Sequence, residues 1–291
     1  MDFAQQLVNG VQIGSVYALV AIGYTMVYGI AKMINFAHGD IIMVGSYVAL
    51  LFFQSSGLPV WGVIAATAAV SAVLGVTIER LAYKPLRGGS RMSALITTIG
   101  VSLMLQNGFL LIFGSSPKPF PNHFTGEGFT LGGVTVSRLT AITLVVTVVL
   151  MVLLTLFVNR TRVGKAMRAV SEDQGAAQLM GINIDTSISI TFAIGSALAA
   201  VAAVLYSSTY PLINPYMGSM LGLRAFIAAV IGGIGVIPGA MIGGFIIGIA
   251  EALIKRYNSS AMADAIVFAL LIIVLLVKPS GLLGRNEREK V

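Results

Sequence analysis

Long apolar runs, separated by short polar segments, repeat along almost the whole chain. Runs such as Ala141–Val158 and Thr191–Tyr206 are continuous rather than alternating, which predicts membrane-spanning helices and argues against the strands of a β-barrel. Glycine, proline and polar residues divide the chain into spans near Leu7–Ile30, Phe36–Phe53, Trp61–Leu81, Met92–Phe113, Leu139–Val158, Ile188–Tyr206, Leu221–Ile234, Ala240–Leu253 and Ala263–Val277. We therefore predict an all-α, polytopic helical membrane protein with about eight or nine transmembrane or re-entrant helices. They form a single domain over residues 1–291.

The amino-acid composition is also that of a membrane-embedded protein. Of the 291 residues, 57% are hydrophobic and 10% are charged, and the mean hydropathy is +0.93. The net charge of +7 does not indicate a nucleic-acid partner, because the cations gather in the connections between spans. The absence of cysteine excludes disulfides and thiolate metal sites, and it leaves the redox compartment undetermined.

The distribution of cations predicts the orientation of the spans. Three clusters should be cytoplasmic by the positive-inside rule. They are Arg80, Lys84, Arg87 and Arg91; the segment Arg160–Arg168; and Lys278, Arg285, Arg288 and Lys290. The proline- and glycine-rich connection Gly114–Ser137 is then an external loop, and the N-terminus lies outside, with Lys255 and Arg256 as a minor exception to the rule. The first span lacks the basic flank of a cleaved signal, so we expect it to be retained.

Residues 160–185, called the coupling segment below, are the longest charged stretch inside the chain. Ser171 followed by Gln174 fits a capping box, and Gly181 is placed to end the helix in a left-handed conformation. The pattern predicts a helix of about nine residues over Glu172–Met180, which is too short to span a bilayer. From the residues alone, this segment either rests on anionic lipid through its basic first part or receives a soluble partner.

Several motifs, in the same order along nearly the whole chain, resemble the Liv-type permeases of branched-chain amino acid importers. They are GSVYALVAIGYTMVYGI near the start, MINFAHGD at Met33–Asp40, AVSEDQGAAQLMGIN at Ala169–Asn183, INPYMG at Ile213–Gly218, GGIGVIPGAMIGG at Gly232–Gly244 and GIAEAL at Gly248–Leu253. Length and motifs are similar to the smaller of the two paralogous permeases. AVSEDQGAAQLMGIN is also similar to the coupling segment of ATP-binding-cassette importer permeases in general. In the best-known version of that segment Leu-Pro follows the isoleucine, whereas this chain has Gly181-Ile182-Asn183.

The resemblance implies a multi-pass permease of the bacterial inner membrane that passes branched-chain amino acids into the cytoplasm. The implied partners are a paralogous permease in a heterodimer, two ATP-binding-cassette ATPases, a substrate-binding protein and membrane lipid, but no nucleic acid. ATP and Mg would be bound by the ATPases, and this chain would be non-catalytic and bind no cofactor. The residues implied to contact the ATPase are Ser171, Glu172, Asp173, Ala176, Ala177, Gly181 and Ile182.

Motifs for catalysis are missing from the sequence. The only Gly-Lys pair has Asn159 where a phosphate-binding loop needs its first glycine and Ala166 where it needs serine or threonine, so a partner must hydrolyse ATP. His38 and His123 fall on opposite sides in the predicted topology, which leaves no two-histidine metal site.

Polar and glycine residues within the spans are candidates for the substrate path or gate. Asn35, His38 and Asp40 sit where a cytoplasmic turn meets the second span. Asn35 could instead cap that helix, with Asp40 balanced by a nearby cation.

The second group of candidates lies near the C-terminus. Arg224 either pairs with Glu251 or meets a substrate carboxylate. Gly232, Gly233 and Gly235 precede Pro238 and predict a broken helix, which either packs tightly or lines the path.

Three alternatives remain open at the level of sequence. Permeases for urea or short amides share these motifs. A self-contained secondary transporter would use Asp40, Glu251 and Asp264 to relay protons. A passive channel is disfavoured because the sequence has no recognisable charged filter.

Overall fold

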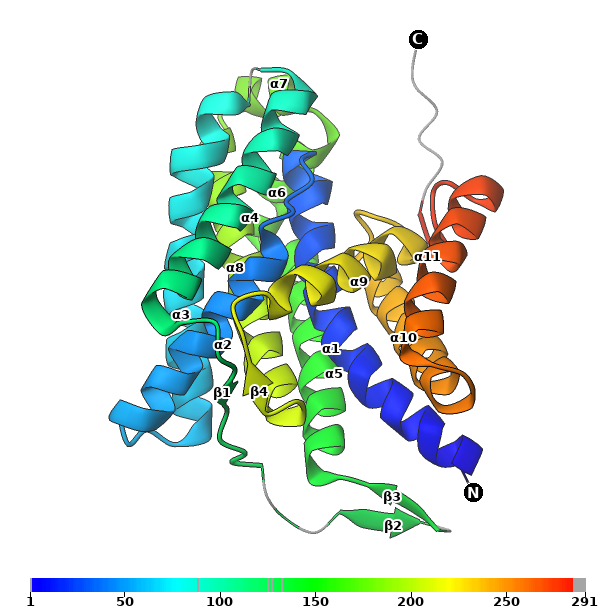
Figure 1. Ribbon diagram of the computed structural model, residues 1–291. Coiled ribbons are helices and arrows are strands. Elements are labelled where there is room, and N and C mark those ends of the chain that lie inside the picture. Colours follow the sequence, from blue (N-terminus) through cyan, green and yellow to red (C-terminus); the bar gives the residue numbers. More distant parts are fainter. Residues whose placement is uncertain (1, 88, 125, 127, 132, 285–291) are drawn as a thin grey trace.

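The computed structural model is helical throughout its membrane-spanning part (Figure 1). It describes residues 2–87, 89–124, 126, 128–131 and 133–284. The helices are α1 (Asp2–Ala31), α2 (His38–Ser55), α3 (Val60–Ile78), η1 (Glu79–Tyr83), η2 (Lys84–Leu86), α4 (Arg91–Phe113), α5 (Arg138–Arg160), α6 (Arg162–Glu172), α7 (Gln174–Leu179), α8 (Ile184–Thr209), α9 (Met217–Gly232), α10 (Ile237–Tyr257) and α11 (Ser260–Val277). Each predicted span coincides with one of these helices, so the predicted fold class is confirmed.

Six of the helical stretches are long and apolar enough to cross a membrane by length and composition. They are Phe3–Ala31, Val60–Leu86, Met92–Phe113, Arg138–Arg160, Ile184–Thr209 and Ile237–Tyr257. The apolar helices Met217–Gly232 and Ala261–Val277 are shorter. In Figure 1, α2 and α9 both begin about midway between the two ends of the molecule, rather than at an end.

Short strands organise the connections at the end of the molecule where the N-terminus lies. β1 (Lys118–Pro119) pairs antiparallel with β4 (Leu212–Ile213), and β2 (Phe129–Leu131) pairs with β3 (Val134–Val136). The first pair joins the connection after α4 to the connection after α8.

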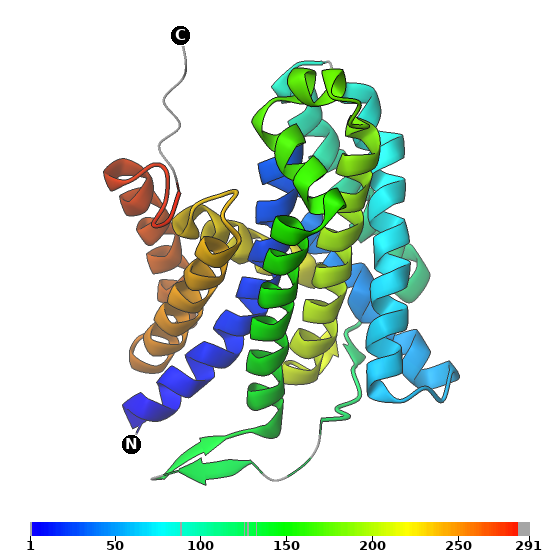
Figure 2. The same ribbon diagram turned by 180° about the vertical axis from the view of Figure 1, so that it is seen from behind.

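The cationic connections lie together at the opposite end. The η1–η2 turn and the coupling segment both occupy the upper end in Figure 1, and Figure 2 shows the same arrangement from behind. The predicted grouping of the first two cation clusters on one side therefore agrees with the structure. Of the third cluster, Arg285, Arg288 and Lys290 lie outside the described residues, and Lys278 follows α11.

Close contact between α1 and α10 forms the centre of the fold. A methyl group added to Gly248 would overlap the Cα of Gly14, and one added to Gly244 would overlap the backbone of Ala18. Glycine at these positions lets the two backbones touch, which is how helices gain attraction in a medium where burial of apolar surface is not a driving force. The core around α1 includes the fully buried Leu19 and Ile22.

The predicted break in the glycine-rich region is also present. Helix α9 ends at Gly232 and α10 begins at Ile237, with Gly233 and Gly235 at φ +107° and +96° between them. These are left-handed values that favour glycine. The carbonyls of Ile231 and Gly232 accept hydrogen bonds from the backbone N–H groups of residues 282 and 283. The segment after α11 thus provides hydrogen-bond donors for carbonyl groups at the C-terminal end of α9, which have no partner within that helix.

A matched pair of substitutions tests the central contact. Gly248→Ala places a methyl group inside the α1 backbone, and we expect it to cost about 1–3 kcal/mol of stability. Gly100→Ala on α4, where nothing lies within 4 Å, should instead gain up to about 1 kcal/mol from helix propensity. Thermal unfolding of the purified chain in detergent measures both. Equal melting temperatures for the two variants would contradict the packing role of Gly248.

Candidate functional site

The coupling segment folds as two short helices, α6 and α7, and the second begins two residues later than predicted. Helix α6 continues through Ser171, whose hydroxyl donates to the carbonyl of Arg168. Asp173 has an extended backbone and starts α7, and its Oδ1 accepts from the N–H of Ala176 at 2.9 Å. The predicted capping box at Ser171 is therefore wrong. The helical hydrogen bond from Asp173 N–H to Ala169 carries α6 past Ser171, and the carboxylate two residues later becomes the cap.

The predicted end of the helix is confirmed. Gly181 has φ +77° and its N–H donates to the Gln178 carbonyl, while the N–H of Ile182 donates to the carbonyl of Ala177. These two bonds are the Schellman arrangement, in which a left-handed residue satisfies the last carbonyls. Helix α7 thus spans Gln174–Leu179, shorter than the predicted Glu172–Met180.

One face of the coupling segment is anchored and the other is open. Met167 and Val170 on α6 and Ala177 on α7 are buried in the protein. Leu179 and Met180, by contrast, are 90% and 82% exposed at the far tip. Because the apolar stripe of α6 is used against the protein itself, a position free on a lipid surface is disfavoured. The exposed apolar tip remains available to a partner.

An ion-pair cluster anchors the segment where α8 begins. The Asp185 carboxylate forms ion pairs with the ammonium of Lys84 at 2.7 Å and with the guanidinium of Arg87 at 2.6 Å. Arg87 also pairs with the buried Glu79. The hydroxyl of Ser189 donates to Glu79 at 2.6 Å. Burial lowers the pKa of the Arg87 guanidinium, and the Asp185 carboxylate acts in the opposite direction. The cluster fastens the start of α8 to the turn between α3 and α4.

The second candidate region is the junction of α2 and α9. Methyl groups added to Gly39 or Gly218 would overlap the carbonyl oxygen of the other residue, and Gly222 also lies against Gly39. The two helix N-termini are therefore in backbone contact. Since α2 and α9 both begin midway along the molecule (Figure 1), this contact lies between the two ends of the helical bundle and not at either end.

A local repeat produces this contact. Residues 34–39 read INFAHG and residues 213–218 read INPYMG, each just before or at the start of its helix. The N–H of His38 donates to the Asn35 carbonyl at 3.1 Å, and the N–H of Met217 donates to the Asn214 carbonyl at 3.2 Å. The two turns thus have the same hydrogen bond, and their equivalent glycines meet.

The candidate residues of the first turn have separate environments. Asn35 does not cap α2, whose N-cap is Ala37, and its Oδ1 instead accepts from the Tyr83 hydroxyl at 2.7 Å. His38 is buried against Gly23, with its ring 4.6 Å from the ring of Tyr24.

Among the described residues, Asp40 accepts a hydrogen bond and forms no ion pair. Its Oδ1 receives the amide of Gln106 on α4 at 2.9 Å. The same amide nitrogen lies 2.8 Å from the hydroxyl of Ser219 on α9. Asp40 and Ser219 follow the equivalent glycines of the repeat, so Gln106 bridges matching positions on α2 and α9.

Arg224 on α9 lies in a charged network. Its guanidinium contacts Glu251 at 2.9 Å and also Asp264 on α11, and Tyr17 on α1 donates to Glu251 at 2.6 Å. The predicted pairing with Glu251 is therefore present. Lys255 pairs with Glu251 as well, which compensates the cation that departs from the positive-inside pattern.

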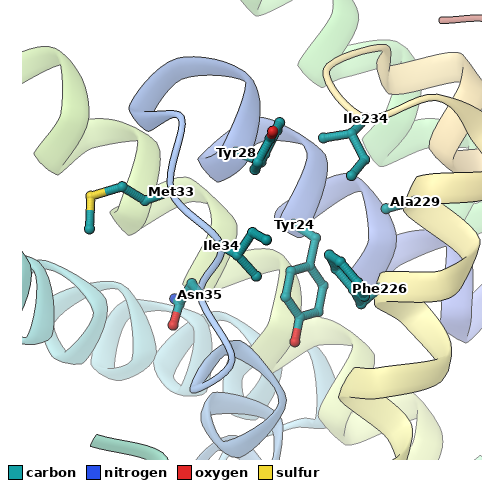
Figure 3. A pocket seen from close by; sticks show the side chains of 8 residues that line it. All are labelled: Tyr24, Tyr28, Met33, Ile34, Asn35, Phe226, Ala229 and Ile234. Atoms are coloured by element: carbon teal, nitrogen blue, oxygen red, sulfur yellow. The ribbon is translucent and has the colours of Figure 1, made fainter. Parts of the chain in front are cut away.

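A small aromatic pocket lies beside the first turn (Figure 3). Tyr24 and Tyr28 of α1 and Phe226 and Ala229 of α9 surround it, with Ile34 and Ile234 closing it. Asn35 is at its edge, so one predicted path residue borders an apolar pocket, whereas His38 and Asp40 are not among its lining residues.

Sequence reasoning missed several of these partners. Glu79 and Gln106 lie inside predicted spans and belong to no recognisable motif. Ser219 was not singled out, although the INPYMG repeat could have pointed to it. Among the path candidates, Asn35 and Asp40 belong to the first turn and its helix, whereas Gly232, Gly233 and Gly235 form the turn between α9 and α10.

Comparison with known proteins gives the family. Residues 6–275 match the protein family described as "branched-chain amino acid transport system / permease component". The chain is 49% identical to the high-affinity branched-chain amino acid transport system permease protein LivH of Escherichia coli, covering 99% of this chain and 98% of that one. It is 48% identical to BraD of Pseudomonas aeruginosa over the same shares. The ribose import permease protein RbsC of Escherichia coli is 25% identical, covering 92% of this chain and 83% of that one.

The matched region contains both the coupling segment and the α2–α9 junction. The apolar helices agree with a multi-pass membrane protein. The chain belongs to the family of branched-chain amino acid transport system permease components.

Proposed function

We propose that this chain is the membrane-spanning permease subunit of an ATP-binding-cassette importer that moves leucine, isoleucine and valine into the cytoplasm. The family membership and the names of LivH and BraD as branched-chain amino acid transport system permease proteins support this cargo. In this proposal a paralogous permease completes the transmembrane unit in the bacterial inner membrane. Two ATPases bind ATP and Mg, and a substrate-binding protein delivers the amino acid.

The exposed tip of α7 is the observation that carries the link to ATP. Leu179 and Met180 project from a helix whose opposite face is buried, at the same end as the cationic turns. Nucleotide-driven closure of the ATPases can shift the membrane helices only through a contact whose free energy differs between the two states. The short capped helix α7 leads directly into α8, and the Asp185 ion pairs fasten the start of α8 to the η1–η2 turn. This arrangement supports α7 as the place of such a contact.

The charged network argues against a self-contained proton-coupled transporter. Such a transporter needs carboxylates free to exchange protons, but two of the three that it would use, Glu251 and Asp264, are paired with Arg224. Their contacts join α9 to α10 and α11, which is a structural role.

Uptake by proteoliposomes tests the proposed function. With ATP trapped inside and the binding protein outside, we expect leucine uptake only when this chain, its paralogue and the ATPases are all present. Urea and ribose should not be taken up, and a protonophore should change leucine uptake less than twofold. Leucine uptake by this chain alone would contradict the importer proposal, and urea uptake would identify the related amide permease instead.

Substitution at the α7 tip tests the coupling contact. Leu179→Asp places a charge where we expect an apolar contact, and burial of a leucine is worth about 1.5–3 kcal/mol. Substrate-stimulated ATP hydrolysis by the assembled complex should fall at least about tenfold.

Leu179→Met keeps an apolar side chain of similar volume and is the matched control, expected to hydrolyse ATP at nearly the original rate. Gly181→Val, which strains the left-handed turn after α7, should also weaken the stimulation. Full stimulation in Leu179→Asp would show that the ATPase binds elsewhere.

A further inference from the structure

Polar side chains of α4 and α9 form a patch that is partly buried and partly exposed. It consists of Ser102, Gln106 and Asn107 on α4 and Ser219 on α9, and is called the α4–α9 patch below. Ser102 lies about ten residues, or about 15 Å, from the start of the apolar stretch Met92–Phe113. The patch is thus well inside the span.

The surroundings of the patch are apolar and exposed. Leu103, Met104 and Leu111 on α4 are 53%, 66% and 87% exposed. Within this surface Asn107 and Ser219 are themselves exposed, and the Asn107 amide donates only to the Leu103 carbonyl among the hydrogen bonds seen in the described residues. Hydrocarbon cannot satisfy the remaining polar atoms, so a patch of this kind faces either water or a polar partner.

Unsatisfied hydrogen-bonding capacity lies directly behind the patch. Asp40 is 1% exposed, and its Oδ2 has no hydrogen-bond partner among the described residues. The Gln106 amide has two protons, but the Asp40 carboxylate and the hydroxyls of Ser102 and Ser219 all lie 2.8–3.1 Å from its nitrogen. The serine hydroxyls can donate as well as accept, so the acceptor that the described hydrogen bonds leave unsatisfied is Asp40 Oδ2.

The charge balance points to a cationic ligand. No ion pair to Asp40 is formed in the part of the chain that the structure describes, in contrast to Glu79, Glu251 and Asp264, which all pair with arginine. A group with positive charge and several N–H donors could donate hydrogen bonds to Asp40 Oδ2 and to the serine hydroxyls, and would neutralise the carboxylate.

We propose that the α4–α9 patch lines the aqueous translocation path, and that Asp40 receives the α-ammonium group of the amino acid in transit. This inference rests on the proposed function, which supplies the substrate class. Gln106 then acts as a positioning residue, because it orients the Asp40 carboxylate from α4 while its amide also contacts Ser219. The apolar residues of the same face suit the aliphatic side chain of the cargo.

Thiol labelling tests the inference, because the natural chain contains no cysteine. Ser219→Cys and Asn107→Cys are introduced separately into the complete importer in membrane vesicles. Each is treated with a cationic and an anionic methanethiosulfonate reagent of similar size. We expect modification at both positions, because these reagents attack a thiolate in contact with water. Val149→Cys on α5 is the matched control, half-exposed but within an apolar span, and should stay unmodified.

The charge of Asp40 should determine which reagent is faster. At Ser219→Cys we expect the ratio of the cationic to the anionic modification rate to be about tenfold higher than the same ratio for a free thiol in solution, because one carboxylate lies nearby. Asp40→Asn should remove this preference and slow leucine uptake, whereas Asp40→Glu should retain the preference. Co-purification of the partner subunits confirms that each variant assembles.

Two results would overturn the inference. If neither introduced cysteine is modified, the patch is covered by a partner helix rather than by water. If labelling occurs with the same charge preference in Asp40→Asn, Asp40 does not attract the cation. Leucine uptake by the unsubstituted importer is measured in the same vesicles, so that failure of the proposed function is seen separately from failure of this inference.

Discussion

Direct contact between helix backbones is the constraint on which the rest of this structure depends. Lipid surrounds the helices, so exclusion of apolar surface from water gives no preference for one helix pairing over another. Glycine supplies the preference, by allowing Gly14 to meet Gly248 and Gly39 to meet Gly218. The first contact fixes α10 on α1, and the second holds the starts of α2 and α9 together between the two ends of the helical bundle.

Buried charges add specificity to this packing. Glu79 and Glu251 are both almost fully buried, and each is paired with an arginine from another element. Breaking such a pair leaves an uncompensated charge at a cost of about 3–5 kcal/mol, so these helices are held in one arrangement. Asp40 differs, because an amide rather than a cation faces it. In our proposal, that difference separates a carboxylate that fixes the fold from one that binds the substrate in transit.

The two candidate regions are connected through α8. This helix begins beside the coupling segment at Asp185 and packs along α2, where Ala200 and Ala203 contact Gly45. In the proposed importer, a displacement of α7 therefore reaches α2 through continuous packed helices. The same displacement would alter the geometry between Asp40 on α2 and Ser219 on α9, which a single amide on α4 bridges.

The sequence by itself determined the helical membrane class, the positions of the spans, the break before Pro238 and the left-handed turn at Gly181. These follow from hydropathy and from the conformational freedom of glycine, which are local properties. Only the tertiary structure decided that α6 continues through Ser171, that Asn35 binds Tyr83 instead of capping α2, and that Gln106 joins Asp40 to Ser219. The contacts of Asn35 and Gln106 join side chains far apart in the chain, and no local pattern records which of them meet. At Ser171 two neighbouring cap residues, Ser171 and Asp173, compete, and the sequence pattern fits both.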